Sequence, residues 1–589
     1  MDIASIARLV SSVVRIPRYS AVGVTGSGYV VYGSTEEGGY RLYAMDPRSR
    51  SRARLTPEPV HFLARSHRSS DLVVFTRDVA RGYELSQVFV AEVPGGEKGV
   101  LDPDAPPMRI VGLGFDGTRV AWSGARKEEA GIYLAKVAEG RAERIAKIRG
   151  REFVTDVNDR FVVGYGVLKG DPRAMELFVL DLRTNEMRVV TPKDGSTNTS
   201  PVLRGTKLLF MSNYEDGDTM RLYIYDAESD AFEKPRFGHG DLERFGPIEF
   251  TSYGWTEDGR IWAVAKRDGR TKLFVDGKEV PTPTGFLVGA DEAGGVLYAT
   301  YTSMRTPPAV VAIDLGTGRF EKLAGAEPPK EVVDAIGEVR VVRYRSFDEL
   351  EVPAYVMESK RAPKPGPTVI YPHGGPWAEV ADVWSPIIAV LAALGYHVVA
   401  PNYRGSTGYG EKFRRLIIGD AGGGEFRDVV YSRKWAVESG LADEKKVAIM
   451  GYSYGGYMTF YALTREPDLW RCGVAGAGIT DWGEEYELAD AYFKHFTEIL
   501  FGGKKDLFKE RSPITYVDNI KAPICIVHPQ NDSRTPLRPV MRFVQRLMEK
   551  NHSFELHVLP DIGHAISLDP DSMEKFLLYA ATYLKKCLG

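Results

Sequence analysis

The chain has 589 residues, more than one hydrophobic core of about 250–300 residues can organise, so we expect two large domains. With 43% hydrophobic and 26% charged residues, the composition is that of a folded globular protein and excludes a disordered chain. A formal charge of −3, from 76 basic and 79 acidic residues, argues against nucleic acid or an acidic membrane as a partner.

The N-terminal segment, residues 1–20, is predicted to form a helix. Its apolar residues recur at helical spacing, and Asp2, Arg8 and Arg15 interrupt the continuous apolar stretch that a signal peptide or a membrane span needs. The three cysteines are too few and too widely spaced for a disulfide framework or a zinc knuckle. These features favour a cytoplasmic protein, and a low content of glutamine and asparagine is a weak indication of a hot environment.

Residues 21–325 carry a repeat of short strands, each ending in two or three β-forming residues and usually an acid. The ends fall every 38 to 50 residues, at Asp46, Glu92, Lys136, Asp181, Asp226, Asp276 and Asp314. A four-stranded propeller blade takes roughly 40–50 residues. The seven copies therefore predict an all-β seven-bladed propeller domain, with a β-sandwich as the alternative. A second β-rich run precedes most ends, as at residues 30–32 and 72–75, and we expect these runs to be the inner strands of the blades.

Residues 326–589 alternate short buried strands with helical patterns, which is typical of a βαβ domain with a mainly parallel sheet. Strand-like runs begin at 367, with further runs at 396–400, 447–450, 473–476, 524–527 and 554–558. Helical patterns lie between them, at about 382–394, 424–439, 455–465, 536–550 and 570–586. The chain thus changes class from an all-β half to an α/β half.

A candidate nucleophile lies in the α/β half, in the segment Gly451-Tyr452-Ser453-Tyr454-Gly455-Gly456. The segment joins a buried strand to a helical pattern, and small neighbours allow the sharp turn that presents a serine hydroxyl in α/β-hydrolases. With 61 glycines in the chain, the spacing alone is weak, so the strand-turn-helix context carries the prediction. Ser453 is therefore the predicted nucleophile.

Activating a serine requires a histidine base and an orienting carboxylate, which follow the serine in that fold in the order Ser, acid, His. Asp532 follows the strand at 524–527 and His564 follows the strand at 554–558, so both fall at carboxyl strand ends. His528 is the alternative base and Asp561 the alternative acid. Chain order and reach favour Asp532 and His564.

The developing negative oxygen of acyl transfer needs two preorganised N–H donors. The residue after the nucleophile, Tyr454, supplies the first. The second is expected from a loop after an early strand, and the run His373-Gly374-Gly375-Pro376 follows the strand at 367–371. We assign this donor to the N–H of Gly375; an ordinary turn is the alternative interpretation of that run.

Taken together, these motifs resemble the prolyl oligopeptidase family of serine peptidases. The resemblance rests on the segments at 373–376, 402–410, 451–456, 531–532 and 563–564, and it covers the C-terminal half densely. It implies a seven-bladed propeller that restricts entry to short peptides, ahead of an α/β-hydrolase domain. It also implies that residues 1–20 pack back onto that domain.

Within that family, residues 405–410 and 531–536 are most similar to the acylaminoacyl peptidases, which release an N-acylated residue from short peptides. Dipeptidyl peptidases of the family hold a free amine with a Glu-Glu pair in the propeller. The pairs Glu36-Glu37 and Glu128-Glu129 lie in turn-like polar stretches, which favours acylated substrates. The resemblance further implies that Arg534 binds a peptide carbonyl or carboxylate, and that an apolar pocket is formed by Trp377, Trp482, Phe493 and Phe496.

The predicted activity is therefore hydrolysis of short, N-acylated peptides through an acyl-enzyme, with no metal or cofactor. Two alternative activities are those of a dipeptidyl peptidase and of a broad carboxylesterase, since the same triad cleaves esters. A non-catalytic binding scaffold would require a broken triad, and every element of the triad is present. Short peptides are the expected partners, and a homo-oligomer is a candidate assembly.

Overall fold

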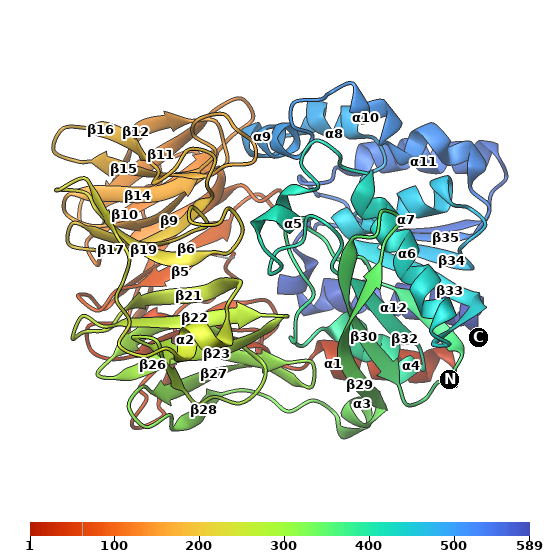
Figure 1. The fold of residues 1–589 in the computed structure, drawn as a ribbon, viewed down its shortest axis with the longest axis horizontal. Helices are drawn as coiled ribbons and strands as arrows, with labels where there is room; N and C mark the ends of the chain where they lie inside the picture. The colour runs from red at the N-terminus through yellow and green to blue at the C-terminus, as the bar shows by residue number, and fades with distance from the viewer. Residues whose placement is uncertain (62) are drawn as a thin grey trace.

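The fold was analysed in a computed structural model, which describes residues 1–61 and 63–589. An all-β body and an α/β body lie side by side (Figure 1). The described residues of the all-β body form seven four-stranded sheets, each made of four consecutive strands paired antiparallel. The predicted propeller is thereby confirmed, and the described strands of the first and last blades stay in separate sheets.

The blades follow one another in chain order. The first four are β1 (Tyr19–Val24), β2 (Val30–Ser34), β3 (Arg41–Met45), β4 (Arg52–Arg54); β5 (Ala64–Ser66), β6 (Leu72–Asp78), β7 (Ser86–Glu92), β8 (Gly96–Val100); β9 (Arg109–Phe115), β10 (Arg119–Ala125), β11 (Ala130–Lys136), β12 (Arg141–Ile148); and β13 (Glu152–Val157), β14 (Phe161–Gly166), β15 (Glu176–Asp181), β16 (Glu186–Val190). The last three are β17 (Asn198–Arg204), β18 (Lys207–Ser212), β19 (Arg221–Asp226), β20 (Ala231–Glu233); β21 (Glu249–Trp255), β22 (Ile261–Arg267), β23 (Arg270–Val275), β24 (Lys278–Val280), preceded by the short helix α2 (Asp241–Phe245); and β25 (Phe286–Ala293), β26 (Val296–Ser303), β27 (Thr306–Asp314), β28 (Phe320–Ala324).

The innermost strands differ from the expectation. The recurring strand ends read from the sequence belong to the third strand of each blade, and the β-rich runs before them are the second strands. The innermost strands are instead β1, β5, β9, β13, β17, β21 and β25, which line a channel of about 1440 Å³. Channel-facing positions carry polar residues such as Ser66, Asp156 and Arg204, so these strands lack the apolar pattern that marks a buried strand.

The α/β body is built on one sheet in the order β29-β30-β32-β31-β33-β34-β35-β36, in which β29, β30 and β32 pair antiparallel and the strands from β32 to β36 pair parallel. Its strands are β29 (Ile336–Arg345), β30 (Glu351–Ser359), β31 (Gly366–Ile370), β32 (His397–Pro401), β33 (Ala442–Tyr452), β34 (Cys472–Gly476), β35 (Ile524–Pro529) and β36 (Phe554–Leu559). The helices are α3 (Lys330–Ala335), α4 (Pro386–Leu394), α5 (Glu411–Arg415), α6 (Gly424–Glu438), α7 (Tyr454–Arg465), α8 (Trp482–Leu488), α9 (Ala491–Leu500), α10 (Leu507–Glu510), α11 (Leu537–Glu549) and α12 (Pro570–Leu588), with short 3-10 turns η1 (Pro513–Asn519) and η2 (Ile566–Leu568).

Two buried clusters sandwich this sheet, because successive side chains of a strand point to opposite faces. In β33, Ala448 and Met450 pack with α4 and α12, whereas Val447 and Ile449 pack with α6, α7 and α11. The N-terminal helix α1 (Ile3–Val14) joins the first cluster through its buried face and contacts α4 and α12. The α/β body is therefore covered by helices from both ends of the chain (Figure 1).

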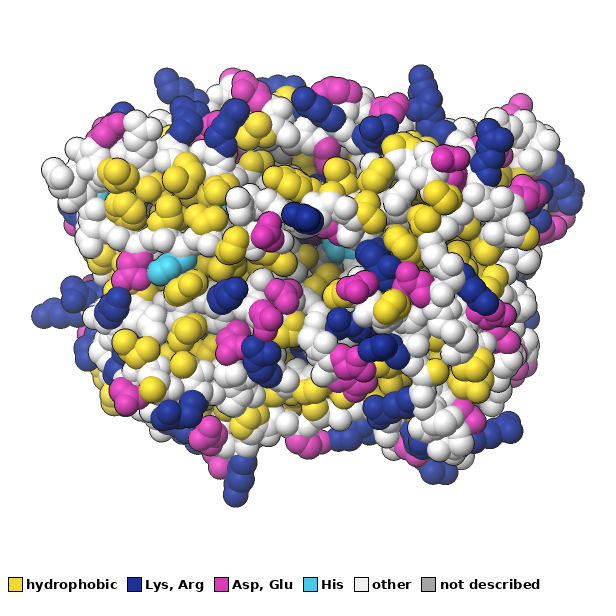
Figure 2. Space-filling model, turned by 180° about the vertical axis from the view of Figure 1, so that it is seen from behind, with side chains coloured by type: hydrophobic (Ala, Val, Ile, Leu, Met, Phe, Trp, Pro, Cys, Tyr) yellow, Lys and Arg dark blue, Asp and Glu magenta, His cyan; other side chains and the backbone are white. Residues whose placement is uncertain are grey.

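The surface seen in Figure 2 carries basic and acidic side chains interspersed, in keeping with the small net charge. Among the described residues, no helix is long and apolar enough to cross a membrane.

Candidate functional site

Ser453 sits at the corner between β33 and α7 in a strained conformation, with φ 60° and ψ −122°. Positive φ is rare for a residue with a side chain, and here it lifts the hydroxyl off the end of the strand. The neighbouring glycines are sterically required: a Cβ on Gly455 would lie 2.2 Å from the Pro372 carbonyl oxygen, and one on Gly456 would lie 2.3 Å from that of Gly476. The glycine pattern in the sequence thus reflects backbone crowding around Ser453.

Three side chains from distant parts of the sequence form one hydrogen-bonded chain. His564 Nε2 lies 2.8 Å from Ser453 Oγ, and His564 Nδ1 lies 2.7 Å from Asp532 Oδ2. The Asp532 carboxylate is buried and also accepts hydrogen bonds from the backbone N–H groups of Arg534 and Thr535. Burial opposes ionisation of Asp532, but the His564 imidazole and these hydrogen bonds outweigh it and hold the carboxyl pKa below its usual value.

The two alternative residues lie outside this chain of contacts. His528 is buried, and its Nε2 lies 2.7 Å from the Thr535 carbonyl oxygen. Asp561 is exposed. The geometry therefore suits His564 as the base that takes the Ser453 proton and Asp532 as the group that orients it.

The loop at 373–376 lies against the nucleophile. A Cβ on Gly374 would lie 3.3 Å from Ser453 Cβ, and Gly375 has φ 123°, which a residue with a side chain rarely adopts. His373 anchors the loop from behind: its Nε2 lies 2.8 Å from Ser406 Oγ, and its ring stacks on Tyr403. Burial lowers the pKa of His373 to about 4, so the anchor is neutral.

Gly375 and Tyr454 line a cavity of about 340 Å³ that also contains Ser453. Tyr454 begins α7, and the first N–H groups of a helix have no acceptor within the helix. The arrangement is compatible with an oxyanion hole at these two N–H groups.

Most of the side chains expected to bind substrate surround the same cavity. Trp482, Phe493, Phe496 and Arg534 line it, together with propeller residues such as Phe153. Trp377 differs from the expectation, since it is not among the described residues that line the cavity; its ring packs edge-on against Phe496, with centroids 5.4 Å apart. The cavity thus lies between the propeller and the α/β body.

A buried charge cluster on the propeller side was not predicted. Glu84 is 2% exposed, lines the cavity, and accepts hydrogen bonds from Arg534, at 2.6 Å, and from Arg109. Burial alone would raise the pKa of Glu84, but the two guanidinium groups hold it well below its usual value. Arg109 also bonds Asp490, at 2.6 Å, in the α/β body. Nothing local in the sequence marks Glu84, because one arginine partner comes from the next blade and the other from the α/β body.

The propeller loop that carries Glu84 also touches the loop of the predicted base. Gly82 has φ 94°, and a Cβ there would lie 2.3 Å from the backbone N of Gly563, the residue before His564. Asn531, beside Asp532, donates a hydrogen bond of 2.7 Å to the Arg81 carbonyl oxygen. The positions of the base and the acid therefore depend on contact with the propeller.

We expect Gly82→Ala to lower kcat/KM by about 100-fold, because a displacement near 1 Å of a catalytic group has an effect of that size. Gly170→Ala is the matched control, since Gly170 has φ 86° and no atom within 4 Å of the added Cβ. Both variants carry the same backbone strain, so circular dichroism melts and kinetics on both separate strain from displacement. Equal activity of the two variants would show that the loop contact does not position His564.

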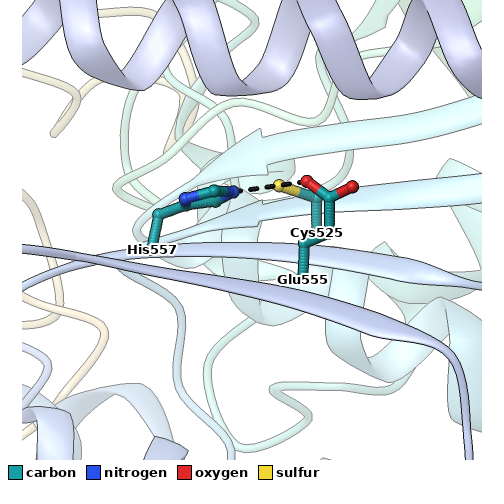
Figure 3. A group of neighbouring side chains, drawn as sticks. All are labelled: Cys525, Glu555 and His557. Carbon is teal, nitrogen blue, oxygen red and sulfur yellow. Dashed lines mark hydrogen bonds and ion pairs between the residues drawn. The ribbon is translucent and has the colours of Figure 1, made fainter.

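A separate group of side chains consists of Cys525, Glu555 and His557 (Figure 3). It lies toward the amino ends of β35 and β36, whereas the site lies at the carboxyl ends of the strands. The ligand atoms of the three side chains lie within 4.8 Å of one another. As a metal site the group fits poorly, because Glu555 is paired with Lys586 Nζ at 2.8 Å and burial raises the pKa of the Cys525 thiol. His557 lies 3.3 Å from Glu555 and stacks on Tyr579.

In comparison with known proteins, each of the two bodies matches a family model. Residues 384–589 match the prolyl oligopeptidase family, and residues 31–311 match the N-terminal domain of acylamino-acid-releasing enzyme-like proteins. Among curated relatives, dipeptidyl aminopeptidase BIII of Pseudoxanthomonas mexicana is 31% identical over 49% of this chain and 44% of its own length. The acylamino-acid-releasing enzyme of Arabidopsis thaliana is 29% identical over 67% of this chain and 51% of its own.

The chain spans about half the length of these curated relatives. A solved structure of a puromycin-hydrolyzing peptidase from Mycobacterium tuberculosis superimposes with a TM-score of 0.81, covering 100% of this chain and 96% of that one at 20% identity. At this identity the likeness concerns the fold alone.

Proposed function

Because this chain belongs to the prolyl oligopeptidase family, we propose that it is a serine peptidase that hydrolyses short peptides and releases N-acylated amino acids. The observation that carries the proposal is the hydrogen-bonded chain from Ser453 through His564 to the buried Asp532. Its position at the carboxyl ends of parallel strands, beside a cavity between two bodies, suits a substrate that must enter past the propeller.

In the proposed cycle, His564 Nε2 takes the proton of Ser453 Oγ as that oxygen attacks the substrate carbonyl. Asp532 keeps the imidazole in the tautomer that accepts this proton and stabilises the imidazolium that forms. The N–H groups of Gly375 and Tyr454 stabilise the tetrahedral oxyanion. His564 then protonates the leaving amine, and a water molecule activated by the same imidazole hydrolyses the acyl-enzyme.

The preference for acylated substrates is supported by the state of Glu84. A propeller carboxylate could hold a free substrate ammonium, but both oxygens of Glu84 accept hydrogen bonds from the Arg534 guanidinium, and Oε2 also bonds Arg109. Glu36, Glu37, Glu128 and Glu129 are not among the described residues that line the cavity. A neutral acyl group therefore suits the propeller side better than an ammonium.

Three substrates with the same side chain separate the proposed activity from its alternatives: an N-acetyl-leucine anilide, a free-amine dipeptide anilide ending in leucine, and a simple leucine ester. We expect kcat/KM to be higher for the acetylated anilide than for the dipeptide anilide. A dipeptidyl peptidase would reverse that order. A carboxylesterase would cleave the ester and leave both anilides nearly untouched.

A cytoplasmic location and a thermophilic source are also proposed on composition, the first from the three widely spaced cysteines and the second from the low content of glutamine and asparagine. The second is tested by thermal unfolding, for which we expect a midpoint well above the roughly 45–65 °C that is common for mesophilic domains.

A further inference from the structure

A buried carboxyl group without a protein partner lines the cavity. Glu485 is 5% exposed and lies in the cavity wall with Ser453. In the part of the chain that the structure describes, its carboxyl group makes no hydrogen bond and no ion pair. A buried carboxylate without a partner is costly to keep, so a group that persists there is suited to a ligand that supplies the missing partner.

The fold places Glu485 in the wall of the cavity that contains the nucleophile. Trp482, Glu485 and Ala489 are spaced three and four residues apart on and just after α8, so they share one face, and all three line the cavity. The Trp482 ring lies 6.2 Å from the ring of Tyr454, the residue after Ser453. Glu485 therefore belongs to the wall beside the reacting carbonyl, on the side of the α/β body.

Among the described residues, the charges around the cavity leave Glu485 without a counterion. Arg109 and Arg534 are matched by Glu84 and Asp490. An ionised Glu485 therefore adds one unbalanced negative charge to the wall. The other acidic residues near Glu485 already have partners. Asp532 is hydrogen-bonded to His564, and Asp481 caps the N-terminus of α8. Glu484 is paired with Arg538 and Arg542.

We propose that Glu485 binds a positively charged side chain, lysine or arginine, of the residue whose carbonyl Ser453 attacks. The proposal rests on the proposed peptidase function. Trp482, Phe493 and Phe496 would cover the apolar stem of such a side chain, and their ring faces suit a cation as well. The cavity would thus select an acylated basic residue as well as accept apolar ones.

The test compares kcat/KM for N-acetyl-lysine, N-acetyl-arginine and N-acetyl-leucine anilides in the parent enzyme and in Glu485→Gln. We expect the variant to lose about 10- to 100-fold on the two basic substrates, the range of one charge-assisted hydrogen bond, with the leucine substrate unchanged or improved. Glu487→Gln is the control, because Glu487 is exposed on the same helix and the substitution removes the same charge. Titration with an organophosphate counts the competent sites in each preparation.

The inference is overturned by a parent enzyme that cleaves the leucine substrate but neither basic one, or by an equal loss on all three substrates in Glu485→Gln. A loss confined to free-amine dipeptide anilides would also overturn it, since Glu485 would then hold the substrate amine. Failure of the peptidase proposal looks different. The anilides would all be inert, and matching lysine and leucine esters would still report the selectivity of Glu485.

A pH profile gives a second readout. Burial, with the like charges of Asp532, Asp481 and Glu484, raises the pKa of Glu485 well above its usual value, so the empty cavity favours the protonated carboxyl. A cationic side chain favours the ionised form, so the lysine-to-leucine ratio of kcat/KM should rise as pH increases through this pKa. Any pH effect on the chemical step that both substrates share cancels in the ratio. Among the described residues, the other charged or titratable groups that line the cavity are His61, Glu84, Arg109, Tyr454, Tyr492 and Arg534. In Glu485→Gln the ratio should be flat.

Discussion

Ser453→Ala is expected to lower kcat on an N-acetyl-amino-acid anilide by about 10⁴- to 10⁶-fold, as loss of a serine nucleophile does in other triad hydrolases. The residual rate would come from substrate binding and from the N–H groups of Gly375 and Tyr454. KM should change little, because the hydroxyl contributes mainly to the transition state. Steady-state kinetics and loss of labelling by an organophosphate measure both effects.

The control for this variant is Ser49→Ala, which removes an exposed hydroxyl in a propeller turn. It should retain parental kinetics and labelling. Activity of Ser453→Ala within about tenfold of the parent would refute the assignment of the nucleophile, since loss of any triad member has far larger effects.

Asp532→Asn is expected to lower kcat by about 10³- to 10⁴-fold while the protein stays folded. The carboxylate Oδ2 lies 2.7 Å from His564 Nδ1 and 2.9 Å from Thr535 Oγ1. An amide of the same shape cannot balance the imidazolium that forms when His564 takes the Ser453 proton. If its NH₂ group faces Nδ1, it also favours the tautomer whose Nε2 carries a hydrogen and cannot accept that proton.

Asp561→Asn provides the matched control, because Asp561 is the other acid considered and lies exposed three residues before His564. Its φ of 56° is one that asparagine tolerates, so the substitution should leave folding and kinetics unchanged. A large loss in Asp561→Asn together with near-parental activity in Asp532→Asn would contradict the assignment of the acid. Tm values of both variants exclude unfolding as the cause.

Local sequence information was sufficient for the core of the site. The turn around Ser453 could be recognised because backbone crowding there requires glycines, and the glycines are visible as a motif in the sequence. Asp532 and His564 could be found because parallel strands bring their carboxyl ends to one edge of the sheet, so chain order and strand ends restrict the choice. The third strands of the blades could be counted because they are buried and regularly spaced.

Other features depend on contacts that the sequence does not encode locally. The innermost blade strands face a channel and carry polar residues, so their sequences do not show the apolar pattern of a buried strand. The antiparallel strands β29 and β30 were also not predicted. Trp377 was expected in the apolar wall because of its residue type. In the structure its ring packs against Phe496, which lines the cavity, and Trp377 is not among the described lining residues.

The sequence by itself thus determined the fold class and the order of the reacting groups, because both follow from periodicity and from backbone geometry near each residue. Only the tertiary structure decided the walls of the cavity. Glu84 and Glu485 are ordinary glutamates in the sequence. They differ because Glu84 meets Arg109 of the next blade and Arg534 of the α/β body, whereas Glu485 meets no arginine among the described residues. Charge pairing of this kind depends on three-dimensional packing, which no local pattern records.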